Sequence, residues 1–438
     1  MRGKLYQVFD YLLLFCVVIL VTFGVLFIYS SGINSEGINV SREYIKQIIW
    51  AGIGLLLMLG FALYDFRRLA RYAPYLFGFL VFILVYTKIF GRYVNGARSW
   101  IGFGGFGVQP SEFCKIFFIL FLAWYFEHSQ NDNPRHRFVV ASCIMMLPFG
   151  LILIQPDMGT ASVYFPIFLM MSFVAGIPLR YILFLLCGGM FTLLFTVLPI
   201  WQSEIAKHSY HIVGLLTVSK LRLIVVLGTG SVAVLGLLGW FFFRRNKYYY
   251  WIAYVFTILC GALILSKMAA HVLKDYQIQR LIVFLDPYTD AQGSGWNIIQ
   301  SKIAIGSGML WGKGWMQGTQ SQLDFLPENH TDFIFAVVGE ELGFIGVVVL
   351  LLLYLVVLWR GVQIAQDASD IFGRLLAVGI TSMLAFHVLV NVGMTLGIMP
   401  VTGIPLPLMS YGVSSLTTNI MAIAILLNIQ LRKKKLEF

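Results

Sequence analysis

The chain has 438 residues, of which 59% are hydrophobic and 12% are charged, and its formal net charge is +11 at pH 7. Soluble globular domains carry about 25% charged residues, so this composition excludes a soluble domain. We interpret the chain as an integral membrane protein.

Repeated apolar runs indicate how often the chain crosses the membrane. A bilayer core of about 30 Å requires about 20 apolar residues in a helix. Such runs lie at 11–30, 46–64, 73–90, 112–127, 138–155, 159–177, 181–200, 222–243, 249–270, 332–359, 374–396 and 412–430. We predict an all-α polytopic membrane protein with about twelve transmembrane helices. The first run is expected to be an uncleaved helix, because it is long for a signal peptide and no A-x-A site follows it.

The cysteines do not indicate a disulfide framework. All five, Cys16, Cys114, Cys143, Cys187 and Cys260, fall inside apolar runs. Their odd number and their positions argue against disulfides and against thiolate metal sites. We interpret each as a small buried hydrophobic residue.

The distribution of charge predicts the orientation. With the N-terminus in the cytoplasm, the cytoplasmic side receives 17 of the 31 Lys and Arg residues but only 7 of the 20 acidic ones. Cytoplasmic loops of membrane proteins are enriched in Lys and Arg. We therefore predict that both termini are cytoplasmic, and that the basic balance reflects contact with anionic membrane lipid rather than nucleic acid.

The polar connections gather on the outer side, at 88–112, 155–160, 271–332 and 397–411. The extracytoplasmic loop at 271–332 is far longer than a typical connection, which favours a functional role. It contains a semi-apolar stretch at 296–310 that predicts a short interfacial or re-entrant helix. Irregular backbone at membrane depth is tolerated where it lines a wet cavity, so we expect an outward-facing cavity.

The chain is predicted to form one membrane domain over residues 1–438. Within it, the stretch 201–272 is interpreted as an inserted pair of extra helices. Removing an even number of crossings would leave every later loop on the same side.

Five segments carry a resemblance to a known family. They are "FGVQPSEFCK" (106–115), "IQPDMGTA" (154–161), the run from 276 to 308, the run from 312 to 343 with "LPENHTDFIFAVVGEELG", and "GIPLPLMSYG" (403–412). Together they resemble the SEDS family (shape, elongation, division and sporulation) of bacterial peptidoglycan polymerases, and the elongation branch more than the division branch. The likeness covers residues 10 to 432 except 201–272, and it implies a ten-helix core with one extra helix pair.

The resemblance implies a reaction and partners. The family joins lipid II disaccharides into glycan strands outside the bacterial cytoplasmic membrane and releases undecaprenyl pyrophosphate. A class B penicillin-binding protein, which is a transpeptidase, and other membrane proteins of the elongation complex are the implied protein partners. No organic cofactor is implied.

This chemistry needs a base and positive charge. A sugar hydroxyl that attacks an anomeric carbon must lose a proton to a general base, and the departing diphosphate needs cationic side chains or a divalent cation such as Mg²⁺ or Mn²⁺. The sequence leaves the metal requirement open. Asp332 matches the essential aspartate of the family and is the predicted base. The alternative is that Asp332 only stabilises the start of a helix through the helix dipole.

Glu112 and Lys115 form a second candidate site. Their spacing of three residues places them on one helical face near the outer mouth of a membrane helix. Lys115 can neutralise a diphosphate, and the alternative is a purely structural ion pair. Trp100 and Arg98 are candidates for holding the lipid or the glycan, although a Trp at this depth is also typical of an interfacial anchor.

Other charged residues of the outer loops are also candidates for substrate contact. Arg280, Lys302 and Lys313 suit an anionic substrate, although exposed basic residues in loops are usually only solvated. His330 and Glu328 are either an exposed loop pair or substrate contacts.

Three further carboxylates have structural interpretations. Asp157 in "QPDMGT" is typical of a turn. Glu340 lies closer than Glu341 to the helical face of Asp332, so it can shape the cavity, and a buried carboxylate there needs a partner.

Two other functions stay open at this stage. A flippase that moves lipid II across the membrane would also use intramembrane charges, but its charges should be reachable from both sides. A scaffold without activity would tolerate loss of Asp332 and Lys115. The sequence has no Walker motif, HExxH motif or G-x-S-x-G motif that would indicate another reaction.

Overall fold

The computed structural model describes residues 9–34, 38–94, 97–102, 107–206, 208, 210–243, 245–272, 275–293, 295–323 and 325–432. Its contacts divide the chain into two compact units. The core unit comprises Met1–Ile177 with Gln300–Phe438, and the second unit comprises Pro178–Ile299.

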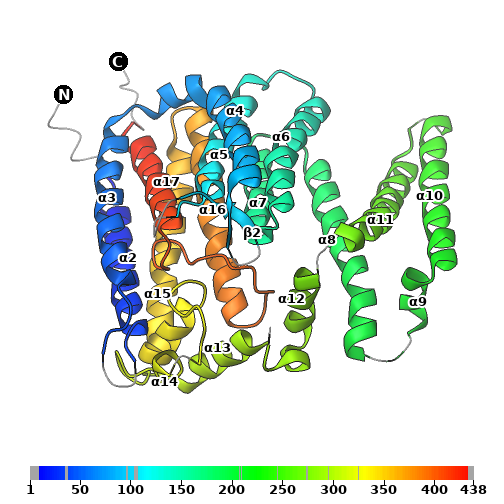
Figure 1. The fold of residues 1–438 in the computed structure, drawn as a ribbon. Helices are drawn as coiled ribbons and strands as arrows, with labels where there is room; N and C mark the ends of the chain where they lie inside the picture. Colours follow the sequence, from blue (N-terminus) through cyan, green and yellow to red (C-terminus); the bar gives the residue numbers. More distant parts are fainter. Residues whose placement is uncertain are drawn as a thin grey trace, which may run out of the picture. The chain divides into compact units, whose positions relative to one another are not determined.

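The core unit is a helical bundle with one short hairpin (Figure 1). Its first part contains α2 (Tyr11–Ser31), α3 (Glu43–Leu63), α4 (Phe66–Phe90), β1 (Arg92–Val94), β2 (Ala97–Trp100), α5 (Pro110–His128), α6 (Pro134–Ile154) and α7 (Met158–Val174). Its second part contains most of α13 (Trp296–Ser307), then α14 (Thr319–Gln322), α15 (Ile334–Asp367), α16 (Ile371–Thr395) and α17 (Val413–Leu431).

The second unit contains the remaining helices. These are α8 (Leu179–Trp201), η2 (Gln202–Ala206), α9 (His211–Thr217), α10 (Ser219–Phe242), α11 (Lys247–Val272), α12 (Asp275–Leu285) and η3 (Pro287–Asp290). The stretch 201–272 lies within this unit, and its origin as an inserted helix pair stays a prediction. In α10 the Nη2 of Arg222 donates to the carbonyl of Leu263 and to the hydroxyl of Ser266 on α11, each at 2.7 Å, while its Nε has no hydrogen-bond partner among the described residues.

Each of the twelve predicted apolar runs lies in a long helix. Among the described residues, ten helices are long and apolar enough to cross a membrane. The other two are α7, with 17 residues, and α5, which carries Glu112, Lys115 and Glu127. The short helix predicted at 296–310 corresponds to α13, and its interfacial or re-entrant position stays a prediction.

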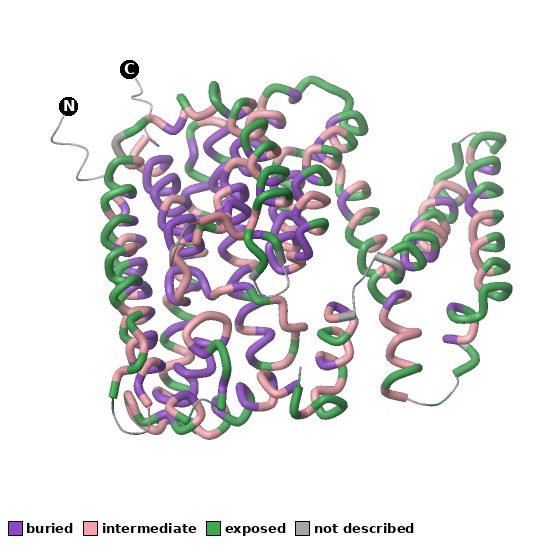
Figure 2. Tube along the Cα trace, viewed as in Figure 1, coloured by how far each residue is buried: buried purple, intermediate pink, exposed green. Residues whose placement is uncertain are grey.

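The centre of the core unit is formed by α16 and α17. In the most apolar window of each helix, 61% of α16 and 89% of α17 is buried, against 11% for α10. Figure 2 shows the same contrast, with buried residues concentrated on the inner helices of the core unit and exposed residues along α10. The buried side chains of α17 include Ser414, Thr418 and Asn419, so the middle of this bundle is partly polar.

One end of the core unit, which we call the basic end, is held by ion pairs. Arg360 contacts Asp10 at 2.7 Å, and Arg67 contacts Asp370 at 2.8 Å. Arg67 also donates to Ser369 at 2.9 Å. These contacts bring the start of α2, the start of α4 and the turn between α15 and α16 to the same end.

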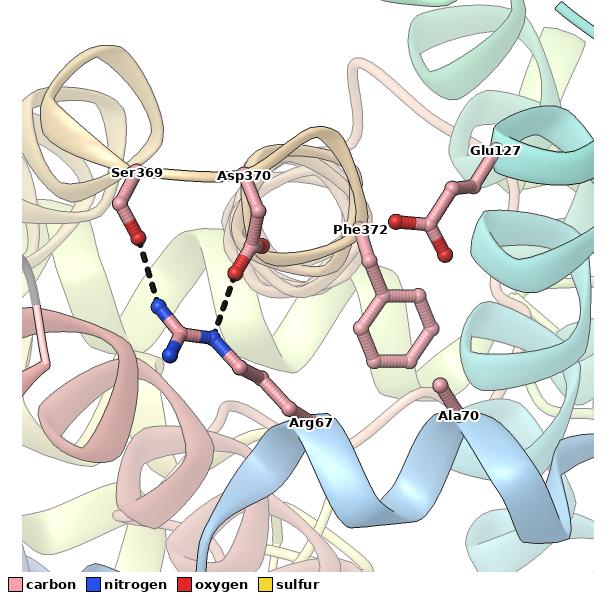
Figure 3. Close-up of a pocket in the computed structure, with 6 residues that line it drawn as sticks. All are labelled: Arg67, Ala70, Glu127, Ser369, Asp370 and Phe372. Atoms are coloured by element: carbon pink, nitrogen blue, oxygen red, sulfur yellow. Dashed lines mark hydrogen bonds and ion pairs between the residues drawn. The ribbon is translucent and has the colours of Figure 1, made fainter. Parts of the chain in front are cut away.

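A cavity of about 340 Å³ opens at the basic end beside Arg67. Figure 3 shows the Arg67 guanidinium directed at Ser369 and Asp370, with Glu127 and the ring of Phe372 on the other side. Asp370 also caps α16 by accepting a hydrogen bond from the Gly373 amide at 2.6 Å. The junction therefore fixes the start of α16, the helix that carries the site described below.

Helix α15 is broken at Gly343, where φ is 66° and ψ is −162°. A break frees backbone groups that must be paired when they are buried. The amides of Phe344 and Ile345 donate to the carbonyls of Met309 and Leu310, at 2.8 and 3.2 Å. The loop that follows α13 thus pairs with the second half of the broken helix.

The first half of the broken helix is paired by the same loop. The amides of Lys313 and Gly314 donate to the carbonyls of Glu340 and Glu341, each at 3.0 Å. This close approach requires a glycine at 312, because a Cβ there would lie 2.1 Å from the Glu341 carbonyl oxygen and φ is +79°. The loop that follows α13 is therefore hydrogen-bonded to α15 on both sides of the break.

The interpretation of every cysteine as a buried residue is wrong for three of them. Cys16 and Cys114 are buried, but Cys143 is exposed and Cys187 and Cys260 are partly exposed. Hydrophobic periodicity identifies a membrane helix but does not distinguish the face that meets lipid from the face that meets protein. All five thiols are free.

Candidate functional site

The first turns of α5 place Glu112 and Lys115 inside the protein. Pro110 occupies the first helical turn after Gln109, which suits a helix start because proline lacks the amide donor. Lys115 Nζ lies 2.8 Å from Glu112 Oε1, and the two side chains are 1% and 6% exposed. The predicted contact across three residues is therefore present, in a buried setting.

A second residue holds the same ammonium group. His387 of α16 places Nε2 2.9 Å from Lys115 Nζ, and its Nδ1 lies 2.6 Å from the carbonyl oxygen of Met383. An ammonium can only donate, so beside a charged Lys115 the imidazole is neutral, with its proton on Nδ1 directed at Met383. Lys115 is thus fixed between an acid and a histidine from two helices.

One helical turn further along α16, Asn391 holds the segment of Asp332. Its Nδ2 donates to the carbonyl oxygen of Asp332 at 2.9 Å and to that of Ile404 at 2.8 Å. Asn391 is fully buried. Residues four apart lie on the same helical face about 5–6 Å apart, so one face of α16 connects Lys115 with the backbone of Asp332.

Asp332 lies in a turn two residues before α15, and Phe333 occupies the N-cap position of that helix. Asp332 is partly exposed. A Cβ at Gly403 would lie 3.4 Å from Asp332 Oδ2, and Gly403 has φ of +72°. The carboxylate therefore faces the segment between α16 and α17, where a glycine leaves room for it.

His330 is not part of an exposed loop pair, as one alternative supposed. Its Nε2 lies 3.0 Å from Glu43 Oε2 at the start of α3, and its carbonyl accepts a hydrogen bond from the Tyr411 amide at 2.9 Å. Burial lowers the pKa of His330, but the hydrogen bond and charge of Glu43, with the charges of Glu328 and Asp332, outweigh it and raise the pKa. His330 thus ties the Asp332 turn to α3.

Glu328 remains on the surface. It is exposed, has φ of +52°, and accepts a hydrogen bond from the Thr331 hydroxyl at 3.0 Å. This contact shapes the turn, and a substrate contact by Glu328 stays a prediction.

Asp157 has the structural role expected for it and one more contact. It caps α7 by accepting hydrogen bonds from the Thr160 amide at 3.0 Å and hydroxyl at 2.8 Å. Its Oδ2 also accepts from Gln109 Nε2 at 2.8 Å. The cap of α7 is therefore joined to the start of α5, next to Glu112.

Glu340 and Glu341 are fully buried and both have partners. Glu340 Oε1 accepts from Lys313 Nζ at 2.8 Å, and Glu341 Oε1 accepts from the Ser30 hydroxyl at 2.5 Å. These carboxylates hold α2 and the loop that follows α13 against α15. The Lys313 ammonium thus pairs with a buried acid and is partly exposed, and its substrate contact stays a prediction.

The remaining predicted basic and aromatic residues are described by other contacts or by their exposure. Lys302 is exposed on α13. Arg98 on β2 is exposed and its guanidinium lies 5.9 Å from the centre of the Tyr93 ring. Trp100 ends β2 and packs near Gly107, just before α5. Arg280 belongs to α12 in the second unit, over the Tyr276 ring at 5.7 Å. Their substrate contacts stay predictions.

Several buried polar atoms at this site have no hydrogen-bond partner among the described residues. They include Glu112 Oε2, Asn391 Oδ1 and Thr402 Oγ1. Buried polar atoms without partners are rare in folded proteins and indicate bound water or a ligand. The three atoms come from α5, α16 and the 396–412 segment, which are the segments that surround Lys115 and Asp332.

Sequence reasoning missed His387, Asn391 and Glu43. The signal for the first two was present in "HVLVN" (387–391), which places two polar side chains four residues apart in an apolar helix. Polar residues inside a membrane helix are functional candidates by default. Glu43 was only one of many charges at a helix end, and no local pattern connected it to His330.

Two expectations are not settled by this geometry. The cavities measured at the basic end, of about 340 and 470 Å³, contain no predicted site residue, so the outward-facing cavity stays a prediction. Within the described part of the chain, no three His, Cys, Asp or Glu side chains gather to hold a metal ion.

Comparison with known proteins identifies the family of this chain. The family described as cell cycle protein FtsW/RodA/SpoVE matches residues 10–217 and 204–435. The peptidoglycan glycosyltransferase RodA of Treponema pallidum is 47% identical, over 97% of this chain and 98% of its own length. Stage V sporulation protein E of Bacillus subtilis is 34% identical, over 96% of each chain.

Solved structures show the same fold. A chain from a peptidoglycan synthase complex, described for the coordination of polymerization and crosslinking, matches with a TM-score of 0.68 and 26% identity. It covers 98% of this chain and 99% of its own. The rod shape determining protein RodA of Thermus thermophilus matches with a TM-score of 0.59 and 26% identity, over 96% of each chain. This chain is therefore a multi-pass membrane protein that belongs to the FtsW/RodA/SpoVE family of cell cycle proteins.

Proposed function

We propose that Asp332 is the general base of this chain, which is a peptidoglycan glycosyltransferase of the type named in its relatives. The substrate is lipid II, and the product is a glycan strand that serves cell elongation and shape. The observation that carries the proposal is the single face of α16 on which His387 holds Lys115 and Asn391 holds the Asp332 backbone.

The reaction requires one proton acceptor and one centre of positive charge. The acceptor sugar hydroxyl forms a bond to the anomeric carbon of the donor while Asp332 takes its proton. The bond from that carbon to the diphosphate oxygen breaks, and the electron pair leaves with undecaprenyl pyrophosphate. A single displacement of this kind inverts the anomeric carbon and needs no covalent sugar intermediate.

Lys115 supplies the positive charge near the leaving group. Glu112 and His387 fix its position, so the ammonium group is organised before the substrate binds, and preorganised charge is more effective than charge that must reorient. The described side chains do not form a metal cage. The proposal assigns the leaving-group charge to Lys115. A divalent cation held mainly by the diphosphate would need only one or two protein carboxylates and would add to that charge.

The proposal places the chain in the bacterial cytoplasmic membrane, with both termini in the cytoplasm and the Asp332 turn outside. The basic end supports this orientation, because Arg67, Arg360 and Arg374 lie there and positive charge is retained on the cytoplasmic side. A class B penicillin-binding protein is the proposed partner, supported by the likeness to a chain of a peptidoglycan synthase complex.

The test is a gel of polymer made from lipid II by the purified protein. Wild type is expected to make polymer, while Asp332→Ala and Asp332→Asn are expected to make none and to melt at the wild-type temperature. Asp132→Ala is the matched control, because Asp132 is an exposed acid in the turn between α5 and α6. Polymer formed at an undiminished rate by Asp332→Ala would rule out the assignment of the base.

The same preparation separates the other two functions. A flippase would move lipid II across sealed vesicles, and that transport would survive Asp332→Asn. A scaffold would support growth with Asp332 and Lys115 both replaced. Because a partner can be needed for activity, the assay is run with and without the class B penicillin-binding protein.

A further inference from the structure

A surface groove at the basic end lies far from the Asp332 site and has no part in the proposed reaction. It has a volume of about 470 Å³ and runs along α16 between α7 and α15. Arg374, Val378 and Ser382 follow one another along α16 at intervals of four residues, and all three line it. Met170 of α7 and Val362 of α15, which are 48% and 47% exposed, form its two rims.

The polar side chains on the floor of the groove already have hydrogen-bond partners. The hydroxyl of Thr381 donates to the Ala377 carbonyl at 2.7 Å, and that of Ser382 donates to the Val378 carbonyl at 2.7 Å. Both hydroxyls are satisfied within α16, and the remaining lining is mainly apolar. An occupant of this part of the groove is therefore expected to be hydrocarbon.

The mouth of the groove is cationic. Arg374 is exposed in the first turn of α16, and no hydrogen bond or ion pair joins its guanidinium to another residue that the structure describes. The acid one turn earlier, Asp370, is already bound to Arg67 and to the Gly373 amide. A guanidinium beside an apolar groove suits a phosphate group, which it can bind through two parallel hydrogen bonds.

The length and the lining of the groove suit a lipid. From Arg374 to Ser382 the groove extends about 12 Å at 1.5 Å per residue. Its lining is mainly apolar, with Arg374 at one end. A phospholipid has the same order of parts, because its acyl chains are apolar and its phosphate is charged.

We propose that this groove binds an anionic glycerophospholipid of the cytoplasmic leaflet, with its acyl chains against Val378 and Ser382 and its phosphate on Arg374. The site holds α7, α15 and α16 together at the end where α16 begins. It is independent of the reaction at Asp332, so its failure would not affect the proposed function.

Lipid retention by the purified full chain tests the site. Native mass spectrometry is carried out in detergent with phosphatidylglycerol or phosphatidylethanolamine of identical acyl chains. Wild type is expected to retain phosphatidylglycerol preferentially, and Arg374→Gln to retain about fivefold less, the effect of one basic residue at an anionic surface. Arg68→Gln is the control, since Arg68 is exposed on α4 at the same end and outside the groove.

A second variant tests the hydrocarbon part. Val378→Trp fills the groove and is expected to reduce the retention of phosphatidylglycerol while Arg374 is intact. Equal retention of phosphatidylglycerol by wild type and Arg374→Gln would overturn the proposal, as would equal retention of the two lipids by wild type. A photoreactive residue at Val362 that captures a discrete membrane protein in cells, rather than lipid, would also overturn it.

Discussion

Asn391 donates a hydrogen bond from its side-chain amide to the backbone carbonyl of Asp332 at 2.9 Å, and a second to that of Ile404 at 2.8 Å. The turn that carries the proposed base is thus fixed from α16 rather than from its own helix. The same helix holds Lys115 through His387, one turn away. The position of the base and the position of the cation therefore depend on one rigid element.

Loss of the two Asn391 hydrogen bonds should lower the rate of polymer formation more than it lowers the free energy of unfolding. Asn391→Ala removes both hydrogen bonds to the Asp332 and Ile404 carbonyls. A displacement of about 1 Å at a reacting group can cost about 100-fold in rate, so a loss of this order is expected in polymer formed from lipid II. Thr395→Val is the control, because the Thr395 hydroxyl bonds only within α16. A variant with wild-type turnover would show that Asn391 does not position the base.

Single and double variants of the buried Glu112–Lys115 pair distinguish a role in stability from a role in catalysis. Glu112→Gln or Lys115→Met alone leaves one buried charge without its partner and should destabilise the protein by about 3–5 kcal/mol. The double variant removes both charges and should recover most of that stability. We expect it to stay inactive, because Lys115 is needed at the diphosphate. Thermal unfolding in detergent and the polymer assay give the two readouts. Activity in the double variant would leave the pair a structural role only.

The contact between His330 and Glu43 should make stability depend on pH. The folded-state pKa of His330 is raised above the ordinary value of 6.5. Its contribution is therefore fully present below about pH 6.5 and is lost as the pH rises through the higher folded-state value. The melting temperature of wild type should fall between pH 6 and pH 9 relative to that of His330→Gln. Parallel curves for the two proteins would contradict a charged His330 in the folded state.

The close backbone contacts between the loop after α13 and the break in α15 predict that residue 312 must be a glycine. At Gly312 a Cβ would meet the Glu341 carbonyl oxygen at 2.1 Å with φ of +79°, whereas a Cβ at Gly306 would meet no described atom within 4 Å other than the nearby backbone of its own helix. Gly312→Ala should destabilise the protein by at least the ~1–3 kcal/mol of a strained backbone. Gly306→Ala lies in α13 and should be neutral or slightly stabilising, because alanine favours a helix. Equal melting temperatures for the two variants would contradict this close contact between the loop and α15.

Much of the structure and function of this protein could be predicted from local patterns in its sequence. Twelve apolar runs predicted twelve long helices, because the thickness of a bilayer fixes the length of each crossing. The spacing of Glu112 and Lys115 predicted their contact, and Asp157 in "QPDMGT" predicted a turn, since both depend on the geometry of a single turn. The cap that Asp157 forms on α7 was not predicted. The family segments indicated the reaction and the choice of Asp332.

The contacts between residues far apart in the sequence became known only from the tertiary structure. Lys115 contacts His387, 272 positions later, and His330 contacts Glu43 from another helix. Lys313 turned out to pair with the buried Glu340. The physical reason is that an apolar helix has the same periodicity whether its polar residue faces lipid, a neighbouring helix or a ligand. The choice among these is made by packing between helices, which a single sequence does not record.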